Sequence, residues 1–289
     1  MDTFDLLTRE LLQLKAQLPD TPFLIGGGMG IYLRSEYHDS DRSPRYKRPV
    51  PTRSTKDLDV ILSAEVIADA SQMDRIRDAL DDLGYEATTE YFQFARDIGD
   101  SGHQVEIDLL TAPPSDEHAD AVKQSGIRAR PRESEGIHGR VAEEAQSIDR
   151  NAIPVDLSAA ADRHGFDLED PTIYIPSSFN YLILKLHAFS DRKDDADADH
   201  GRHHAMDIFT TVTDMSKSDW QDAVQHFKEE CEEDYLQAAI GIQQRHFADE
   251  DDLGILRIQE NEVYRRYEAE FYEYLPNVVG DLNELFSGC

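Results

Sequence analysis

Apolar residues recur with two different periods along the chain, and these periods predict which segments are strands and which are helices. Short continuous or alternating apolar runs predict strands at residues 23–26, 56–62, 91–98 and 103–111. Apolar positions spaced by three and four residues predict helices at residues 3–18, 29–37 and 64–83. Gly84 is a helix stop, and the GDSG segment at 99–102 joins the last two strands in a predicted hairpin.

Helical spacing dominates the C-terminal part of the chain. TIYIP is extended, and Ser177 or Ser178 caps the helix that follows it. Helices are predicted at residues 177–192, 204–215, 217–231, 233–247 and 259–286. Polar segments predict loops at residues 35–55, at 113–150 (with room for one short strand) and at 194–204. We therefore expect an α+β (mixed α/β) fold, with a small mixed sheet flanked by helices over residues 1–170 and a helical domain over residues 171–289.

The chain is strongly acidic, with 59 Asp and Glu against 29 Lys and Arg and a formal net charge of −30. This composition resembles that of proteins from extreme halophiles, where salt of about 1 M shortens the Debye length to about 3 Å and screens surface repulsion. Net acidity therefore does not exclude an RNA or nucleotide partner. Without a run of about 18 apolar residues, no membrane span is expected. The acidic, amphipathic N-terminus does not fit a secretory signal, so we expect a soluble, cytoplasmic protein.

Cysteine usage points the same way. Cys231 and Cys289 are the only cysteines, and they stand in no spacing that is typical of a metal site. We therefore expect no disulfide framework.

Three aspartates lie on predicted strands in positions that favour a shared site. Side chains alternate between the two faces of a strand, so the apolar residues of KDLDVIL face the core while Asp57 and Asp59 project from the other face. In QVEIDLLT the same alternation places Asp108 opposite the core side chains. If the two strands are neighbours, the three carboxylates converge and repel one another without a cation. Hard oxygen ligands of this kind suit Mg²⁺ or Mn²⁺.

Three consecutive glycines follow the first predicted strand. A strand, then Gly26, Gly27 and Gly28, then a helix lets backbone N–H groups approach phosphate oxygens with no Cβ in the way. The segment lacks the G-K-[ST] ending of a Walker loop and does not match G-x-G-x-x-G, so neither a P-loop ATPase nor a Rossmann dehydrogenase is supported.

Each motif alone has a structural explanation. A lone D-x-D is most often a pair of solvated carboxylates, and a triple glycine is usually a turn. Their order favours a nucleotidyltransferase: strand, glycine turn, helix, loop, strand with D-x-D, then a later strand with Asp. Lys185 adds to this, because it lies in the almost apolar segment SSFNYLILKLHAF and a buried lysine needs an anionic partner. The alternative is that Lys185 reaches the surface and pairs with one of many acids there.

The arrangement resembles the nucleotidyltransferase superfamily with a polymerase-beta-like core, and within it the AbiEii-type (MenT-like) toxin nucleotidyltransferases. The family's GG or GGS turn and S-x-D-L-D phrase correspond to the three glycines and to Ser54-Thr55-Lys56-Asp57-Leu58-Asp59. Gly28 stands where the family often has Ser or Thr. The later K-L-x-A-x-x-x-R phrase corresponds to 185–192, but DDADADHG expands the next spacer, and Ala205-Met206 replaces the family's Arg before Asp207. The likeness covers roughly residues 20–110 and 170–215.

The resemblance implies a metal-dependent transfer of a nucleoside monophosphate from a nucleoside triphosphate to an acceptor hydroxyl. It implies that Asp57 and Asp59 hold the metal, that Lys185 neutralises phosphate charge, and that Asp207 or Asp108 completes the metal site or orients the acceptor. Gly26, Gly27, Gly28, Lys56 and Arg192 would bind the nucleotide. The implied acceptor is RNA, notably the tRNA 3′ end, or a protein hydroxyl, and a toxin would have a cognate antitoxin.

Two other functions remain open from the sequence. One is a small-molecule nucleotidyltransferase of the aminoglycoside-modifying kind, and the other is a catalytically silent nucleotide-binding scaffold.

Three further groups of residues are candidates for binding or packing. The basic loop residues either bind phosphates or pair with acidic neighbours; they are Arg42, Arg45, Lys47, Arg48 and Arg53. The histidines His200, His203 and His204 fit no standard metal spacing and are expected in a solvated loop. Trp220 and the tyrosines of 264–274 are expected to pack in the core.

Overall fold

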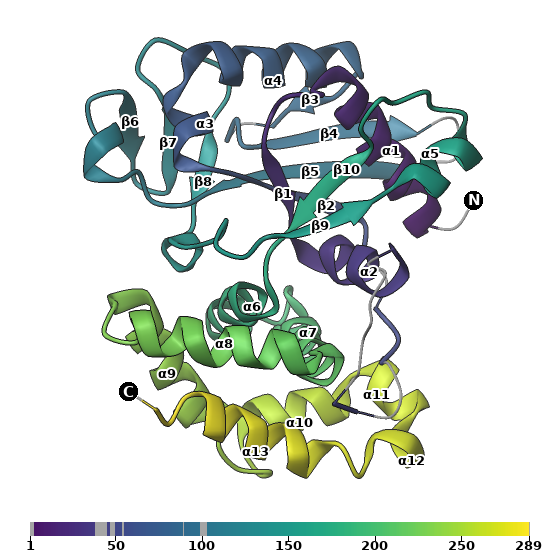
Figure 1. The fold of residues 1–289 in the computed structure, drawn as a ribbon, viewed down its shortest axis with the longest axis vertical. Helices are drawn as coiled ribbons and strands as arrows, with labels where there is room; N and C mark the ends of the chain where they lie inside the picture. The colour runs from purple at the N-terminus through teal and green to yellow at the C-terminus, as the bar shows by residue number, and fades with distance from the viewer. Residues whose placement is uncertain are drawn as a thin grey trace. The chain divides into compact units, whose positions relative to one another are not determined.

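The computed structural model describes residues 3–37, 45–46, 50–53, 55–88, 90–98 and 103–288. These residues form two compact units, one from Met1–His38 and Ser54–Pro176, the other from Asp39–Arg53 and Ser177–Cys289 (Figure 1). The second unit thus begins at Ser177 and not at residue 171, because Thr172–Ile175 is a strand inside the sheet of the first unit. Residues 39–53 also group with the helical unit, although they lie within the 1–170 span expected for the first domain.

The first unit is built on a mixed sheet of ten strands. In the order β6-β7-β8-β5-β2-β1-β10-β9, strands β2 and β5, β5 and β8, and β1 and β10 are parallel, while β4 pairs with β5 and β3 with β4. The strands are β1 Phe23–Ile25, β2 Asp57–Leu62, β3 Glu86–Ala87, β4 Gln93–Ile98, β5 His103–Thr111, β6 Val122–Ser125, β7 Arg128–Pro131, β8 Gly139–Val141, β9 Ile153–Asp156 and β10 Thr172–Ile175. The expected α+β class, with a mixed sheet and a helical C-terminal region, is confirmed, but the sheet is larger than the small one expected.

Three of the extra strands lie in the segment 113–150, for which we expected loops and at most one short strand; the others are β3 and β9. Strands β6, β7 and β8 form there, joined by antiparallel pairing and bordered by the 3-10 helices η2 (Asp116–His118) and η3 (Glu143–Ala145). Each strand has only three or four residues and few large apolar side chains, so its pairing partners, not its own hydrophobicity, define it.

Within the described residues, five α-helices accompany the sheet of the first unit. These are α1 Thr3–Gln17, α2 Gly27–Tyr37, α3 Ala64–Ala68, α4 Ala70–Asp82 and α5 Ser158–His164, and Figure 1 shows α1 and α4 running along the sheet. The helix predicted over 64–83 is broken at Asp69. The Asp69 carboxylate accepts hydrogen bonds from the backbone N–H of Ser71 and Gln72, which makes it the N-cap of α4.

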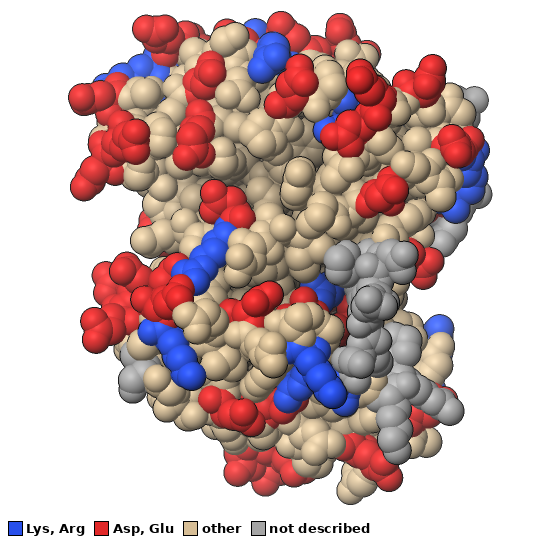
Figure 2. Space-filling model, viewed as in Figure 1, with Lys and Arg blue, Asp and Glu red and all other residues tan. Residues whose placement is uncertain are grey.

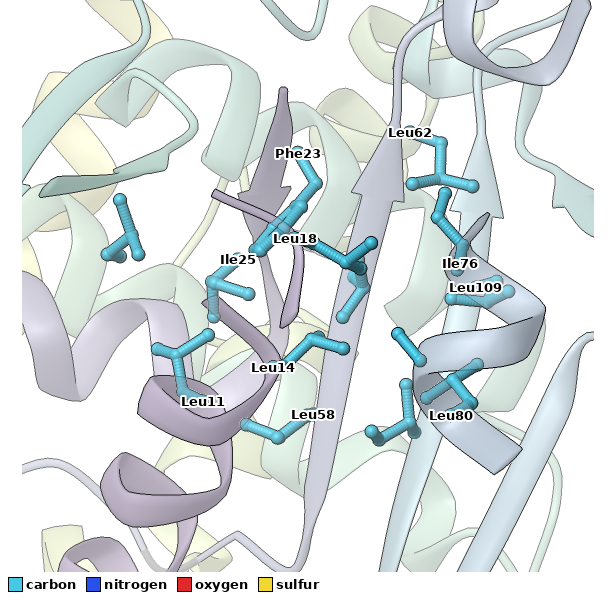
Figure 3. Packing of buried hydrophobic residues seen from close by; sticks show 14 of the residues in the cluster. Leu11, Leu14, Leu18, Phe23, Ile25, Leu58, Leu62, Ile76, Leu80 and Leu109 are labelled. Atoms are coloured by element: carbon cyan, nitrogen blue, oxygen red, sulfur yellow. The ribbon is translucent and has the colours of Figure 1, made fainter. Parts of the chain in front are cut away.

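The core of the first unit lies between these helices and one face of the sheet. Figure 3 shows leucines of α1 and α4 packed against inward-facing side chains of β1, β2 and β5. On β2, Leu58, Val60 and Leu62 are buried in this core. Strand alternation then places Asp57 and Asp59 on the opposite face, as the sequence predicts.

The second unit is helical around its own aromatic-rich core. Its α-helices are α6 Ser178–Arg192, α7 Arg202–Asp214, α8 Lys217–Glu230, α9 Asp234–His246, α10 Leu253–Glu260, α11 Glu262–Arg266, α12 Glu268–Phe271 and α13 Leu275–Leu285, with the 3-10 helix η4 at Asp199–Gly201. Ser177 caps α6. The single helix predicted over 259–286 is interrupted at Tyr267, whose φ of −117° and ψ of 19° leave the helical region. Tyr264, Tyr267 and Tyr274 pack in or against the core, as expected, whereas Tyr272 is 72% exposed and the expectation is wrong for it.

The cysteines, the hydrophobicity of the helices and the surface charge can be compared with what the sequence predicts. Cys231 is disulfide-bonded, a single bond that the sequence analysis did not predict, and Cys289 lies outside the described residues. Within the described part of the chain, no helix combines the length and apolar character that a membrane crossing requires. Figure 2 shows acidic side chains spread over the surface, as the composition predicts.

A buried ion pair ties α1 to β4 in the first unit and gives a test of the fold. Glu10 is 3% exposed, receives a hydrogen bond from the Tyr85 hydroxyl at 2.9 Å and pairs with Arg96. We predict that Arg96→Ala lowers the free energy of unfolding by about 3 kcal/mol, because the Glu10 carboxylate loses its counter-charge in a buried position. Urea unfolding measures this change. The control is Arg77→Ala, which removes partly exposed ion pairs with Asp74 and Asp78 and should cost no more than about 1 kcal/mol; equal losses would contradict the prediction.

Candidate active site

Four carboxylates form a block on the face of the sheet opposite the core. Strands β2 and β5 are parallel neighbours, and their register sets Asp57 beside Glu106 and Asp59 beside Asp108. The convergence predicted for Asp57, Asp59 and Asp108 therefore occurs at the level of the strands. Glu106 is a fourth member that lies on the same face. Like charges directly across from one another on adjacent strands are unfavourable, so this block calls for a cation.

Asp108 is a half-buried member of the carboxylate block. Burial raises the pKa of its carboxyl, and the charges of Asp57 and Glu106 raise it further, while a hydrogen bond from Gln93 and the charge of Arg140 lower it. The net direction is upward. Its Oδ1 atom is buried and has no hydrogen-bond partner among the described residues. A buried acceptor without a donor costs free energy, and a bound cation would supply the missing partner.

The glycine turn packs directly against this block. Gly26 donates its backbone N–H to the Asp59 carbonyl at 2.8 Å, and Gly27 has a φ of +59°. A Cβ on Gly27 would lie 1.8 Å from Asp59 Oδ2, so only glycine leaves room for that carboxylate. Helix α2 begins at Gly27, two residues earlier than predicted. Gly27 and Gly28 are thus the first residues of the helix and not part of a loop before it, and their N–H groups belong to the unpaired amino end of α2.

Gly28 makes room for a residue that the sequence analysis did not single out. A Cβ on Gly28 would lie 2.8 Å from the Thr55 Cβ and 3.0 Å from its Oγ1. Thr55 is 4% exposed and donates its hydroxyl to Asp57 Oδ1. A serine at position 28, as in the family that the sequence resembles, would collide with Thr55. Thr55 stands two residues before Asp57, just ahead of β2, and that spacing is the only sequence signal for it.

The carboxylate oxygens of the block are the kind of ligand that a hard divalent cation prefers. Their positions do not by themselves form a coordination shell around one. Among the described residues, no group of three His, Cys, Asp or Glu side chains is placed to hold a metal ion. The carboxylates are nevertheless oxygen donors, and one of them keeps a buried oxygen without a partner. This donor set is the kind that Mg²⁺ and Mn²⁺ take, with water and substrate oxygens completing the coordination.

Lys185 and Asp207 form an ion cluster within the second unit. Lys185 Nζ lies 2.8 Å from Asp207 Oδ2, and Arg53 donates to both Asp207 oxygens at 2.9 and 3.0 Å. Asp207 is 1% exposed, and although burial raises its pKa, the charges of Lys185 and Arg53 lower it more, so the net direction is downward. The buried lysine therefore has the anionic partner that its position requires. Two cations already satisfy the Asp207 carboxylate, so this cluster accounts for both residues structurally; their catalytic roles stay predictions.

The other nucleotide-binding candidates are more exposed. Lys56 is exposed, and the Arg192 side chain is 52% exposed and lies 3.5 Å from Asp195. In the basic loop, Arg45 pairs with Asp281 at 2.7 Å and stacks over Trp220. Ser54 of the D-L-D phrase, and Arg42, Lys47 and Arg48 of the loop, lie outside the described residues.

A cavity of about 510 Å³ lies elsewhere in the first unit. It is found beyond the carboxyl ends of β2 and β5, where Ser63 and Ala112 line it. Glu65, Asp116 and Asp149 also line this cavity, which gives it an acidic wall. The carboxylate block lies nearer the other end of these strands, so the cavity is not part of the candidate site.

Comparisons with known proteins leave the family open. No family model matches the chain, and no curated protein matches it. Among solved structures, the chain is similar to "Structure of E. coli MS115-1 CdnC:HORMA-deltaN complex", with 12% sequence identity, 99% of this chain and 90% of that chain covered, and a TM-score of 0.27. A similarity of this size does not establish a shared family.

The raised pKa of Asp108 predicts that this residue opposes folding at neutral pH. A carboxyl whose pKa is raised on folding stabilises the protein below its unfolded pKa, and this contribution is lost as the pH rises through the folded value. We predict that Asp108→Asn raises the free energy of unfolding at pH 7 by a few tenths to about 1 kcal/mol in chelator. Thermal unfolding measures this, and Mg²⁺ should stabilise the wild type more than the variant.

The matched control for Asp108→Asn is Asp97→Asn, an exposed aspartate on the neighbouring strand β4. Its effect should stay within about 0.5 kcal/mol. A loss of stability in Asp108→Asn under chelator would contradict the prediction.

The lowered pKa of Asp207 predicts that this residue, unlike Asp108, stabilises the fold at neutral pH. A carboxyl whose pKa is lowered on folding stabilises the protein above its unfolded pKa of about 3.9, and this contribution is lost as the pH falls toward the folded value. We predict that Asp207→Ala costs about 3–5 kcal/mol at pH 7, because it leaves the Lys185 and Arg53 charges uncompensated. Unfolding of the wild type and of Asp207→Asn between pH 7 and about pH 2 tests this. The wild type should lose its advantage as the pH falls, and a constant difference would show that Asp207 is not ionised.

Proposed function

We propose that this protein is a metal-dependent nucleotidyltransferase whose active site is the carboxylate block together with the glycine turn. The observation that carries the proposal is the contact of Asp59 with Gly27. It brings one oxygen of a repelling carboxylate block to the amino end of a helix, where backbone N–H groups and the helix dipole favour phosphate. Cation ligands and a phosphate-binding turn thus meet at one place, as the transfer of a phosphoryl-linked group requires.

The residues of the block would divide the work by position. Asp57 and Asp59 would hold the metal together with Asp108, whose buried Oδ1 has no donor among the described residues. A divalent metal bound there neutralises phosphate charge and favours the ionised form of an attacking hydroxyl. Thr55 would orient Asp57 through its hydrogen bond, and Gly27 would keep the Asp59 carboxylate close to the phosphate-binding turn. The backbone N–H groups at the start of α2 would orient the triphosphate.

The finer assignment follows from the likeness of the motifs. We propose the AbiEii-like branch, in which the acceptor is the tRNA 3′ end or a protein hydroxyl and a cognate antitoxin exists. Lys56 and Arg192 would contact the nucleotide. Lys185 and Asp207 would contribute as the resemblance implies, although their mutual ion pair accounts for them without a ligand.

Metal-dependent nucleotide binding tests the enzyme proposal. We predict that calorimetry at high salt detects binding of a nucleoside triphosphate with Mg²⁺ or Mn²⁺ to the wild type. The double variant Asp57→Ala plus Asp59→Ala should lose this binding by at least about 100-fold, because two of the cation's ligands are gone. The matched control is Asp81→Ala plus Asp82→Ala, which removes the same charge from exposed positions at the end of α4 and should bind as the wild type does.

Failure of the wild type to bind any metal–triphosphate pair at any salt concentration would rule the proposal out. Incubation with labelled triphosphates and total tRNA then identifies the acceptor class. Label on purified tRNA supports the RNA-modifying activity and excludes a silent scaffold. Label confined to a small hydroxylated compound would instead point to a small-molecule nucleotidyltransferase.

A further inference from the structure

One row of side chains crosses the sheet next to the carboxylates and ends in two arginines. The strand pairings align, in order, Arg128, Arg140, Leu110, Ile61, Leu24 and Tyr174. Leu110 is two residues from Asp108 and Ile61 is two residues from Asp59, so the row lies on the same face as the carboxylate block. The two arginines therefore stand at the β8 and β7 side of that block.

The two arginines face each other across antiparallel strands. Arg128 and Arg140 are direct partners in the β7–β8 register. Like charges in this position destabilise a sheet. Arg128 is partly balanced by Glu90 at 3.2 Å, in a pair whose side chains are 42% and 44% exposed. Such an exposed pair contributes little to stability, so it does not explain why two cations are placed together.

Arg140 has no such partner. It is half-buried, and within the described part of the chain its side chain makes no hydrogen bond or ion pair. It is aligned with Leu110, two residues from Asp108 on the same strand face, yet no salt bridge joins Arg140 to Asp108. Gln93 of β4 is the residue in register with Asp108. The guanidinium thus keeps its planar set of donors for an anion beside the carboxylate block.

The surroundings of the arginine pair suit a nucleotide. Tyr91 is 44% exposed, and its ring lies 5.6 Å from the His138 ring in an edge-on arrangement. The backbone N–H of His138 donates to the Tyr91 carbonyl at 2.8 Å. Tyr91 also has a φ of +59°, an uncommon conformation for a tyrosine. His138 is two residues from Arg140, and burial and the charges of Arg130 and Arg128 lower its pKa. An exposed aromatic ring beside cationic side chains is the combination that single-stranded nucleic acids bind.

We propose that Arg140 and Arg128 bind a phosphate group of the acceptor, and that the acceptor is a single-stranded nucleic acid segment. This inference rests on the proposed nucleotidyltransferase function. The glycine turn lies on the β1 side of Asp59, and the arginines lie on the β8 side of Asp108. The donor triphosphate and the acceptor phosphate therefore reach the carboxylates from opposite sides. A polycationic small molecule would be repelled from the arginine side, which disfavours that class of acceptor.

Binding of a short fluorescent single-stranded oligoribonucleotide, measured in chelator across a range of salt concentrations, tests the proposal without catalysis. We expect Arg140→Gln to weaken this binding about tenfold or more and to lower the slope of log affinity against log salt by about 1. Arg140→Lys should retain part of the affinity, because it keeps the charge but loses the planar donor pair. Arg128→Gln should weaken binding less, because Glu90 remains nearby.

The matched control is Arg132→Gln, an exposed arginine just after β7 that bonds to the Ala119 carbonyl. It makes the same change of charge. Because Arg132 lies outside the row that contains Arg140 and Arg128, oligonucleotide binding should stay within about twofold of the wild type. Thermal unfolding completes the test. Arg140→Gln relieves repulsion from Arg128 but also removes attraction to the neighbouring acids, so it should change the unfolding temperature little, whereas an arginine with mainly a structural role would lower that temperature.

The outcomes separate this inference from the proposed function. Equal oligonucleotide binding by Arg140→Gln and the wild type would overturn the inference while metal–triphosphate binding upholds the function. Weakened metal–triphosphate binding in Arg140→Gln, with oligonucleotide binding unchanged, would place the arginine on the donor side and also overturn it. If the wild type binds the oligonucleotide through Arg140 but binds no metal–triphosphate pair, the function fails and the arginines remain a nucleic-acid contact only.

Discussion

The register of β2 against β5 is the constraint on which the candidate site depends. Because the two strands are parallel and aligned, Asp57 faces Glu106 and Asp59 faces Asp108, and alternation commits all four carboxylates to one face while Leu58, Val60 and their neighbours build the core. A shift by one residue would bury the acids and expose the core, so the hydrophobic effect that stabilises the sheet also enforces the repulsion on its other face. The repulsion between these carboxylates lowers the stability of the fold, and a ligand that neutralises their charge restores part of that stability.

The glycines around the carboxylate block show how close packing serves this arrangement. Gly27 accommodates the Asp59 carboxylate, and Gly28 accommodates Thr55, which in turn holds Asp57. Each glycine of the helix start therefore corresponds to one aspartate of the D-x-D. The absence of a hydroxyl at position 28 is then explained by space, since Thr55 already places a hydroxyl there. The start of α2 at Gly27 brings backbone N–H groups next to these carboxylates without an intervening loop.

Period-two alternation was sufficient to predict the strands that carry the aspartates and the face on which they lie, because those strands have a buried face rich in large apolar residues. It was insufficient for β6, β7 and β8, whose short polar sequences become strands only through their partners. Arg140 could not be singled out for the same reason. The pairing of Asp207 with Arg53 was likewise invisible, since 154 residues separate them and Arg53 lies in a segment without helix or strand. The contact between Thr55 and Gly28 could not be predicted for a different reason. It depends on the space between individual atoms, which the periodicity of the sequence does not indicate.

Compensation of charge distinguishes the two acidic centres of the molecule. Asp207 is fully buried, and two cations satisfy it, so its pKa falls and the cluster stabilises its unit without a ligand. Asp108 is half-buried, and its burial raises its pKa; the charges of Asp57 and Glu106 raise it further, while the charge of Arg140 lowers it. A folded protein tolerates such an uncompensated group where binding supplies the balance. On this criterion the carboxylate block and Arg140 are the centre prepared for a ligand, with a cation required on the acids and an anion on the arginine. A phosphate bound beside a divalent metal meets both requirements at once.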